Sequence, residues 1–143
     1  MIIGGTVYRS DGKTAAPDVI VYAYQTNAEG FYVGGSGQTA ASRRHGRLRG
    51  WVRSGADGRY EFETIKPAPY PNNVMPAHVH MMIVEPGRPA YWIDDIVFAG
   101  EFGVDARYRA RQVNRGGSGI INLRRMPRGD ALAVRDIVLE RHP

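Results

Sequence analysis

Two histidines with one residue between them are the strongest chemical signal in this sequence. His78 and His80 stand in the string Pro76-Ala-His-Val-His. On a β-strand, residues two apart point to the same face, so both imidazoles can contact one metal ion above that face. A pair of hydrogen-bonded structural histidines has the same spacing. The metal interpretation therefore needs further ligands from elsewhere in the chain.

Two tyrosines are candidates for those ligands. Tyr70 is held between Pro69 and Pro71, shortly before the histidines, and Tyr32 ends the string Asn27-Ala-Glu-Gly-Phe-Tyr. A tyrosine normally ionises near pH ~10, so a tyrosinate at neutral pH requires a strong Lewis acid, and ferric iron meets that need better than zinc or ferrous iron. The chain has no cysteine, which excludes thiolate zinc sites, iron-sulfur clusters and disulfides.

The spacing of apolar residues predicts an all-β fold. Eighteen glycines and nine prolines divide the 143 residues into short segments that alternate with period two, as in an antiparallel β-sandwich. We expect one domain over residues 1–143. The expected strands cover 2–9, 18–25, 48–53, 59–65, 77–85, 91–99, 119–123 and 133–140, with a long loop over 26–47.

Three details of that arrangement can be tested. Both faces of 18–25 are apolar, which predicts a central strand. The segments 48–53 and 59–65 flank Ala56-Asp57-Gly58 and are expected to form a hairpin. The segment 104–114 is ambiguous, because alternating arginines resemble a strand but few apolar residues accompany them.

Charge and hydropathy indicate a cytoplasmic protein without a nucleic-acid or membrane partner. The formal net charge is +5 and the 19 basic residues include only two lysines, but the arginines are scattered and no nucleic-acid-binding motif surrounds them. No apolar run reaches the ~18 residues that would span a bilayer, and the N-terminus lacks the features of a signal peptide. The sequence leaves open whether the chain forms a homo-oligomer.

These residues resemble the intradiol ring-cleavage dioxygenases, which include the catechol and protocatechuate enzymes. The resemblance covers about residues 4 to 101 and is most specific from Asp57 to His80, where a turn, an alternating strand, Pro69-Tyr-Pro71 and the two histidines follow in the family's order. It implies a transthyretin-like β-sandwich that holds one non-haem Fe(III). The substrates would be an aromatic diol and O₂, and the ring would open between its two hydroxyls to give a muconate-type diacid.

The resemblance also implies residue roles. Tyr32, Tyr70, His78 and His80 occupy the positions of the family's four iron ligands, and Tyr70 is expected to leave the metal and act as the base. Two neighbouring positions depart from the family. Met75 stands where an arginine is usual, and Asp95 is the nearest residue to a usual glutamine. These catalytic positions would therefore offer a thioether and a carboxylate in place of a cation and an amide.

Two other interpretations remain open at the level of sequence. A cupin-like ferrous oxygenase would use His78, His80 and Glu85, although the surrounding glycines of that motif are absent. A non-enzymatic transthyretin-like binding module would explain the first half of the chain alone. Four further residues are candidates for the pocket, but a surface or loop role is the simpler interpretation of each: His45, Arg47, Arg49 and Arg53.

Overall fold

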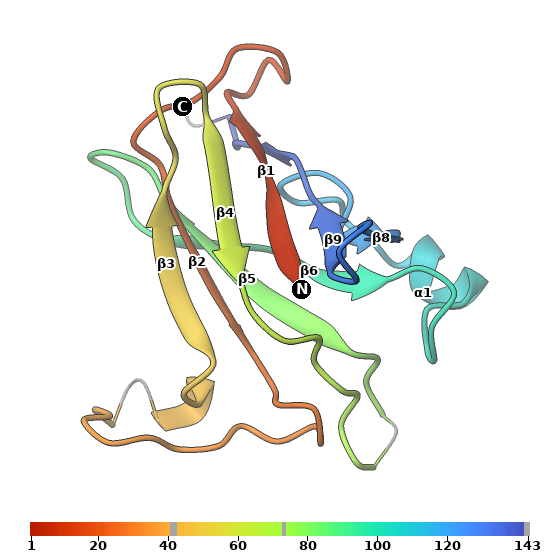
Figure 1. Cartoon of the computed structure of the whole chain (residues 1–143). Helices are drawn as coiled ribbons and strands as arrows, with labels where there is room; N and C mark the ends of the chain where they lie inside the picture. Colours follow the sequence, from red (N-terminus) through yellow and green to blue (C-terminus); the bar gives the residue numbers. More distant parts are fainter. Residues whose placement is uncertain (41–42, 73, 142–143) are drawn as a thin grey trace.

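Two five-stranded β-sheets pack against each other in the computed structural model, which describes residues 1–40, 43–72 and 74–141 (Figure 1). The first sheet contains β10 (Ile137–Val138), β1 (Ile2–Tyr8), β9 (Ala131–Val134) and β8 (Leu123–Arg125), with β4 (Arg59–Glu63) also paired to β1. The second has the order β3 (Arg49–Arg53), β2 (Ile20–Gln25), β5 (His78–Val84), β6 (Tyr91–Phe98) and β7 (Ile120–Ile121). The all-β prediction is confirmed.

Both sheets are mixed and not purely antiparallel. β1 pairs antiparallel with β4 but parallel with β9 and β10, and β7 pairs parallel with β6. The central position predicted for the segment 18–25 is confirmed, since β2 lies between β3 and β5. The ambiguous segment contains the short helix α1 (Ala106–Ala110), which begins where the Asp105 side chain accepts a hydrogen bond from the Tyr108 N–H.

The predicted hairpin of 48–53 with 59–65 is wrong. β3 pairs with β2 in the second sheet, whereas β4 pairs with β1 in the first. The connecting turn therefore crosses from one sheet to the other. The segment predicted as one strand over 119–123 also divides: β7 joins the second sheet, while β8, which begins at Leu123, forms a hairpin with β9 in the first.

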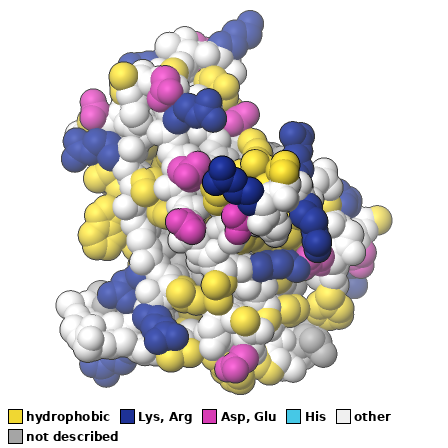
Figure 2. All heavy atoms as spheres, viewed as in Figure 1, with side chains coloured by type: hydrophobic (Ala, Val, Ile, Leu, Met, Phe, Trp, Pro, Cys, Tyr) yellow, Lys and Arg dark blue, Asp and Glu magenta, His cyan; other side chains and the backbone are white. Residues whose placement is uncertain are grey.

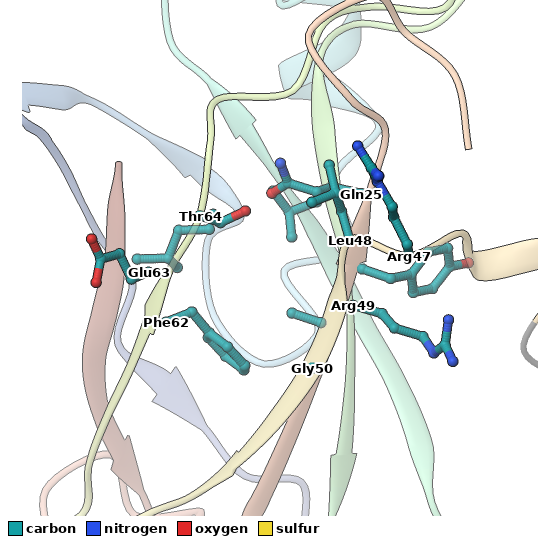
Figure 3. A pocket seen from close by; sticks show the side chains of 12 residues that line it. Gln25, Arg47, Leu48, Arg49, Gly50, Phe62, Glu63 and Thr64 are labelled. Carbon is teal, nitrogen blue, oxygen red and sulfur yellow. The ribbon is translucent and has the colours of Figure 1, made fainter. Parts of the chain in front are cut away.

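A cleft of about 180 Å³ opens at the edge where β3 and β4 separate (Figure 3). Figure 3 shows Phe62 of β4 facing Gly50 and Leu48 across it. Its inner wall includes Ala23 and Val79, whose side chains belong to the core between the sheets. The core draws on both sheets and contains Ile3, Val7, Val21, Met81, Ile83, Ile96 and Phe98 among its buried residues.

The long loop predicted over 26–47 carries the short 3-10 helix η1 (Arg43–His45) and no strand in its described part, while residues 41–42 lie outside the described residues. On the face shown in Figure 2, lysine and arginine side chains are spread among acidic ones and do not gather into one patch. No helix within the described ranges is both long and apolar enough to cross a bilayer.

The first sheet depends on a close approach of the chain to Gly5. A Cβ at this position would lie 2.0 Å from the backbone oxygen of Arg135. That segment is fixed from two sides, because the Tyr60 hydroxyl donates to the Arg135 carbonyl at 2.7 Å and Asp136 accepts from the Thr6 N–H at 2.9 Å. The backbone there has little room to move.

We predict that Gly5→Ala lowers the free energy of unfolding by about 2 kcal/mol, because the new methyl group must displace backbone atoms. Gly50→Ala on β3 is the control: its Cβ would meet only Phe62 at 3.9 Å, and its effect should stay within about 1 kcal/mol. Urea unfolding of both variants measures the difference. Equal stability of Gly5→Ala and the unmodified protein would contradict the close approach.

Candidate metal centre

Tyr32 and Tyr70 come from two loops that are hydrogen-bonded to each other. At the end of β2, the Thr26 hydroxyl donates to the Ala68 carbonyl at 2.9 Å, and the Ala68 N–H donates to the Asn27 carbonyl at 3.1 Å. These bonds hold the start of the loop that carries Tyr32 beside the proline-rich loop that carries Tyr70. The two tyrosines are therefore brought together by hydrogen bonds between residues that precede them in the chain.

A tight turn then directs Tyr32. The Asn27 side-chain oxygen accepts hydrogen bonds from the N–H groups of Glu29 and Phe31, at 3.0 and 2.9 Å. Gly30 adopts a φ of +84°, and a Cβ there would lie 2.1 Å from the Pro69 oxygen. Only glycine allows both the left-handed conformation and this contact.

The histidines lie on the face of β5 that points away from the core. Burial alternates along the strand, with Val79, Met81 and Ile83 inside. His78 is nevertheless only 2% exposed. Its Nδ1 lies 2.7 Å from the Pro76 carbonyl oxygen. A carbonyl can only accept, so Nδ1 carries the proton and Nε2 presents a lone pair.

His80 is oriented by a carboxylate in place of a carbonyl. Its Nδ1 lies 3.0 Å from Asp95 Oδ1, and the two side chains are 22% and 25% exposed. Because the carboxylate accepts this hydrogen bond, Nδ1 of His80 carries the proton and Nε2 is free to act as the ligand atom. Both imidazoles thus present Nε2 on the same side.

Four donor atoms meet at this place. The hydroxyls of Tyr70 and Tyr32 are 2.9 Å apart, the Tyr32 hydroxyl is 3.0 Å from His80 Nε2, and that nitrogen is 3.1 Å from His78 Nε2. Two Nε2 lone pairs that face each other at this distance repel unless a positive charge lies between them. Two imidazoles and two phenols form a donor set that fits one small, hard cation.

Burial shifts the pKa values of Tyr32 and His78, and in both cases it favours the neutral form. Burial, together with the hydrogen bond between Tyr32 and Tyr70, raises the pKa of Tyr32 above its ordinary value. Burial likewise lowers the pKa of His78. The imidazole is then already in the neutral form that a metal requires, whereas the Tyr32 phenol must lose its proton on binding.

Asp95 could also be grouped with the two histidines as a ligand triad, since one donor atom from each lies within 4.8 Å of the others. Its contact argues against that role. Asp95 bonds to Nδ1 of His80, on the side of the ring opposite to the nitrogen that faces Tyr32. The carboxylate therefore supports a ligand and lies outside the group of four donors.

The sequence interpretation missed the aromatic residues behind His80. The Tyr24 ring stacks between two imidazoles, with ring centroids 4.5 Å from His80 and 4.0 Å from His45. His45 Nδ1 is also 2.7 Å from the hydroxyl of Tyr22. Burial raises the pKa of Tyr24 to about 12. The pairing of Tyr24 with His80 across β2 and β5 creates this stack, and no pattern local to either segment indicates it.

The remaining candidates lie apart from the four donors or at their margin. Glu85 follows β5 and accepts a hydrogen bond from Tyr91 at 2.8 Å, so the cupin arrangement is not formed. Met75 is half-buried directly before Pro76. The three arginines have other surroundings: Arg49 donates to the Gly46 carbonyl, Arg53 pairs with Asp18 at 3.6 Å, and Arg47 lines the cleft of Figure 3.

That cleft is not the candidate site. It includes Val79, which points into the core, whereas the neighbouring residues His78 and His80 point to the opposite face of β5.

We predict that Gly30→Ala prevents the two tyrosine hydroxyls from meeting, because the Pro69 carbonyl blocks the new methyl group. After loading with iron in vitro, the metal bound per chain should fall at least about tenfold. Gly12→Ala is the matched control, since Gly12 also has a positive φ of +69° but no atom near its Cβ position. It should carry a similar backbone strain of about 1–2 kcal/mol and bind as much metal as the unmodified protein. Equal iron contents in the two variants would contradict the prediction.

Comparison with known proteins supports the relation that these residues suggest. A family model described as a dioxygenase matches residues 1–112. Catechol 1,2-dioxygenase 1 of Acinetobacter lwoffii is 32% identical over a 127-residue alignment, and the match covers 69% of this chain and 40% of that protein. The chain thus spans less than half the length of this curated relative.

Solved structures have the same fold. The dioxygenase domain of a dioxygenase carbohydrate-binding fusion from Streptomyces sp. SirexAA-E has a TM-score of 0.66 and 23% identity, over 97% of this chain and 78% of that one. Hydroxyquinol 1,2-dioxygenase from Pseudomonas putida DLL-E4 has a TM-score of 0.67 and 22% identity, over 99% and 56%. At this identity the likeness shows the fold alone. Together with the family match, it establishes that this chain belongs to the intradiol dioxygenase family.

Proposed function

We propose that this protein is a non-haem Fe(III) dioxygenase that cleaves a catechol-type ring between its two hydroxyls. The observation that carries the proposal is the meeting of the Tyr32, Tyr70, His78 and His80 donor atoms, each 2.9–3.1 Å from the next. Family membership and the names of the relatives, which act on catechol and hydroxyquinol, support the same reaction.

The four side chains would hold the iron, and the groups behind the histidines would orient the two imidazole rings. Ferric iron, when bound, would supply the Lewis acidity that keeps phenolates and a chelated catechol deprotonated at neutral pH. Pro76 and Asp95 fix the two imidazoles with Nε2 toward the centre. Stacking on Tyr24 limits rotation of the His80 ring.

Tyr70 is the residue that would take a proton from the substrate. Its hydroxyl lies at the end of the chain of four donors, whereas the Tyr32 hydroxyl is held between Tyr70 and His80. Removing Tyr70 from this group would therefore leave the other two contacts, Tyr32 with His80 and His80 with His78, intact. In its phenolate form, Tyr70 would be a strong enough base to accept a catechol proton.

The overall reaction is balanced without a further reductant. Both atoms of O₂ enter the product, the bond between the two hydroxylated carbons breaks, and two carboxyl groups form. The electrons that reduce O₂ come from the ring itself. The protein needs only to bind the diol, move its protons and keep competing water away.

The two departures from the family predict which catechols bind. Met75 contributes no charge beside the histidine strand, and Asp95 contributes a carboxylate behind His80. A substrate with its own carboxylate would find no cation at position 75 and one anion nearby. We therefore expect catechol, hydroxyquinol and apolar substituted catechols to be preferred over protocatechuate.

The first test is the visible spectrum of the iron-loaded protein. We predict a charge-transfer colour that moves to longer wavelength when catechol is added without oxygen. Tyr70→Phe and His78→Ala should each abolish the colour and lower catechol turnover by at least about 100-fold, because a donor is lost.

Tyr91→Phe is the control for this test, since Tyr91 bonds to Glu85 beyond the end of β5. It should keep both colour and turnover. Iron near zero in carefully loaded wild-type protein would favour the non-enzymatic binding module, and retained activity in Tyr70→Phe would remove Tyr70 from the site.

The second test concerns specificity. Met75→Arg should raise the ratio of kcat/KM for protocatechuate to that for catechol by about tenfold, because it introduces a cation beside the site. Val74→Arg places the same charge on the adjacent residue, whose side chain is 67% exposed, and should leave the ratio unchanged. Wild-type protein that turns over protocatechuate faster than catechol would contradict the specificity argument.

A further inference from the structure

The two candidate histidine ligands are oriented by acceptors of different charge. His78 Nδ1 meets a backbone carbonyl at 2.7 Å, whereas His80 Nδ1 meets the Asp95 carboxylate at 3.0 Å. A carbonyl is a neutral dipole. A carboxylate is an anion, and its hydrogen bond to an imidazole N–H is stronger and draws the proton further from the ring.

A β-bulge places the carboxylate there. Between the pairs Val79 with Ile96 and Met81 with Ile93, β5 advances by two residues and β6 by three. Two residues of β6, Asp94 and Asp95, therefore lie opposite the single residue His80 of β5, and their side chains point in different directions. Asp94 turns away and accepts from the Asn114 N–H at 2.8 Å, whereas Asp95 reaches His80. Bulges often direct a side chain into a site in this way.

We propose that Asp95 is a positioning residue that makes His80 the stronger electron donor of the two histidines toward the metal. This inference rests on the proposed function. The hydrogen bond fixes the Nε2-donating tautomer of His80 and gives its ring partial imidazolate character. The unequal donor strength is a property of this chain's own Asp95, because the carbonyl of Pro76 gives no such charge to His78.

Three measurable consequences follow from stronger donation. The affinity for divalent metal rises, since a more basic ligand binds more tightly. The ferric state becomes harder to reduce, because added electron density stabilises the higher charge. Charge transfer from tyrosinate to iron needs more energy, which moves the coloured band to shorter wavelength.

The test compares Asp95→Asn with Asp94→Asn in the whole chain. The first variant keeps an acceptor oxygen beside His80 but removes its charge. The second removes a neighbouring charge on the same strand that contacts Asn114 and not His80. Co(II) affinity, measured by chelator competition, should weaken about 10- to 100-fold in Asp95→Asn and stay within about twofold in Asp94→Asn.

The iron-loaded proteins give a second readout that a merely structural role would not move. Asp95→Asn should shift the charge-transfer band to longer wavelength and the reduction potential to more positive values, while Asp95→Glu, which keeps the charge, should recover part of both shifts. Melting temperatures of all variants report on folding. If Asp95→Asn does not fold, Asp95→Gln takes its place.

The outcomes separate this inference from the function on which it rests. Coloured wild-type protein with an unchanged band and Co(II) affinity in Asp95→Asn overturns the role of Asp95 and leaves the proposed function intact. Equal effects of Asp95→Asn and Asp94→Asn also overturn it, because they would indicate general electrostatics. Wild-type protein that binds Co(II) but never colours with iron overturns the proposed function, while the Co(II) comparison still decides the role of Asp95.

Discussion

One close contact between two loops decides whether the candidate metal centre exists. Gly30 lies against the Pro69 carbonyl, and this approach brings the loop that carries Tyr32 beside the loop that carries Tyr70. The bonds of Thr26 and Asn27 to Ala68 hold the same two loops together at the end of β2. The two phenolic oxygens then lie within hydrogen-bond distance of each other, and the Tyr32 oxygen also lies within that distance of His80 Nε2.

The second sheet supplies the two histidines, and the strand β5 restricts their positions. His78 and His80 are fixed by the pleat of β5, which turns the residues between and beyond them into the core. The carbonyl of Pro76 and the carboxylate of Asp95 then set the orientation of each ring. A rigid pair of imidazoles faces a pair of phenols held by loops. Such a division suits the proposed role of Tyr70 as a base, because the phenols are held by loops and the imidazoles by a strand.

The chain covers only part of its relatives and carries an aromatic face beside the centre. It spans 40% of the curated relative and 56% of the hydroxyquinol enzyme's chain, yet it retains both sheets of the fold. The outer face of the second sheet carries Trp51 and Trp92 with large exposed surfaces, next to Tyr22 and Tyr24. The stack of Tyr24 on His80 connects this face directly to the centre.

The sequence by itself determined the fold class, the strand that carries the histidines and the rigid turn at Tyr70, whereas the roles of Tyr32, Tyr70, His78 and His80 as metal ligands stay a prediction. These features rest on local information: period-two alternation, the i, i+2 geometry of a strand and the stiffness of Pro69-Tyr-Pro71. Only the tertiary structure decided which strands pair. It placed β3 and β4 in different sheets, stacked Tyr24 on His80, and used a bulge to turn Asp95 toward His80. The reason is physical: register, bulges and loop contacts depend on residues far apart in the chain, and their energies are fixed only when the two sheets pack.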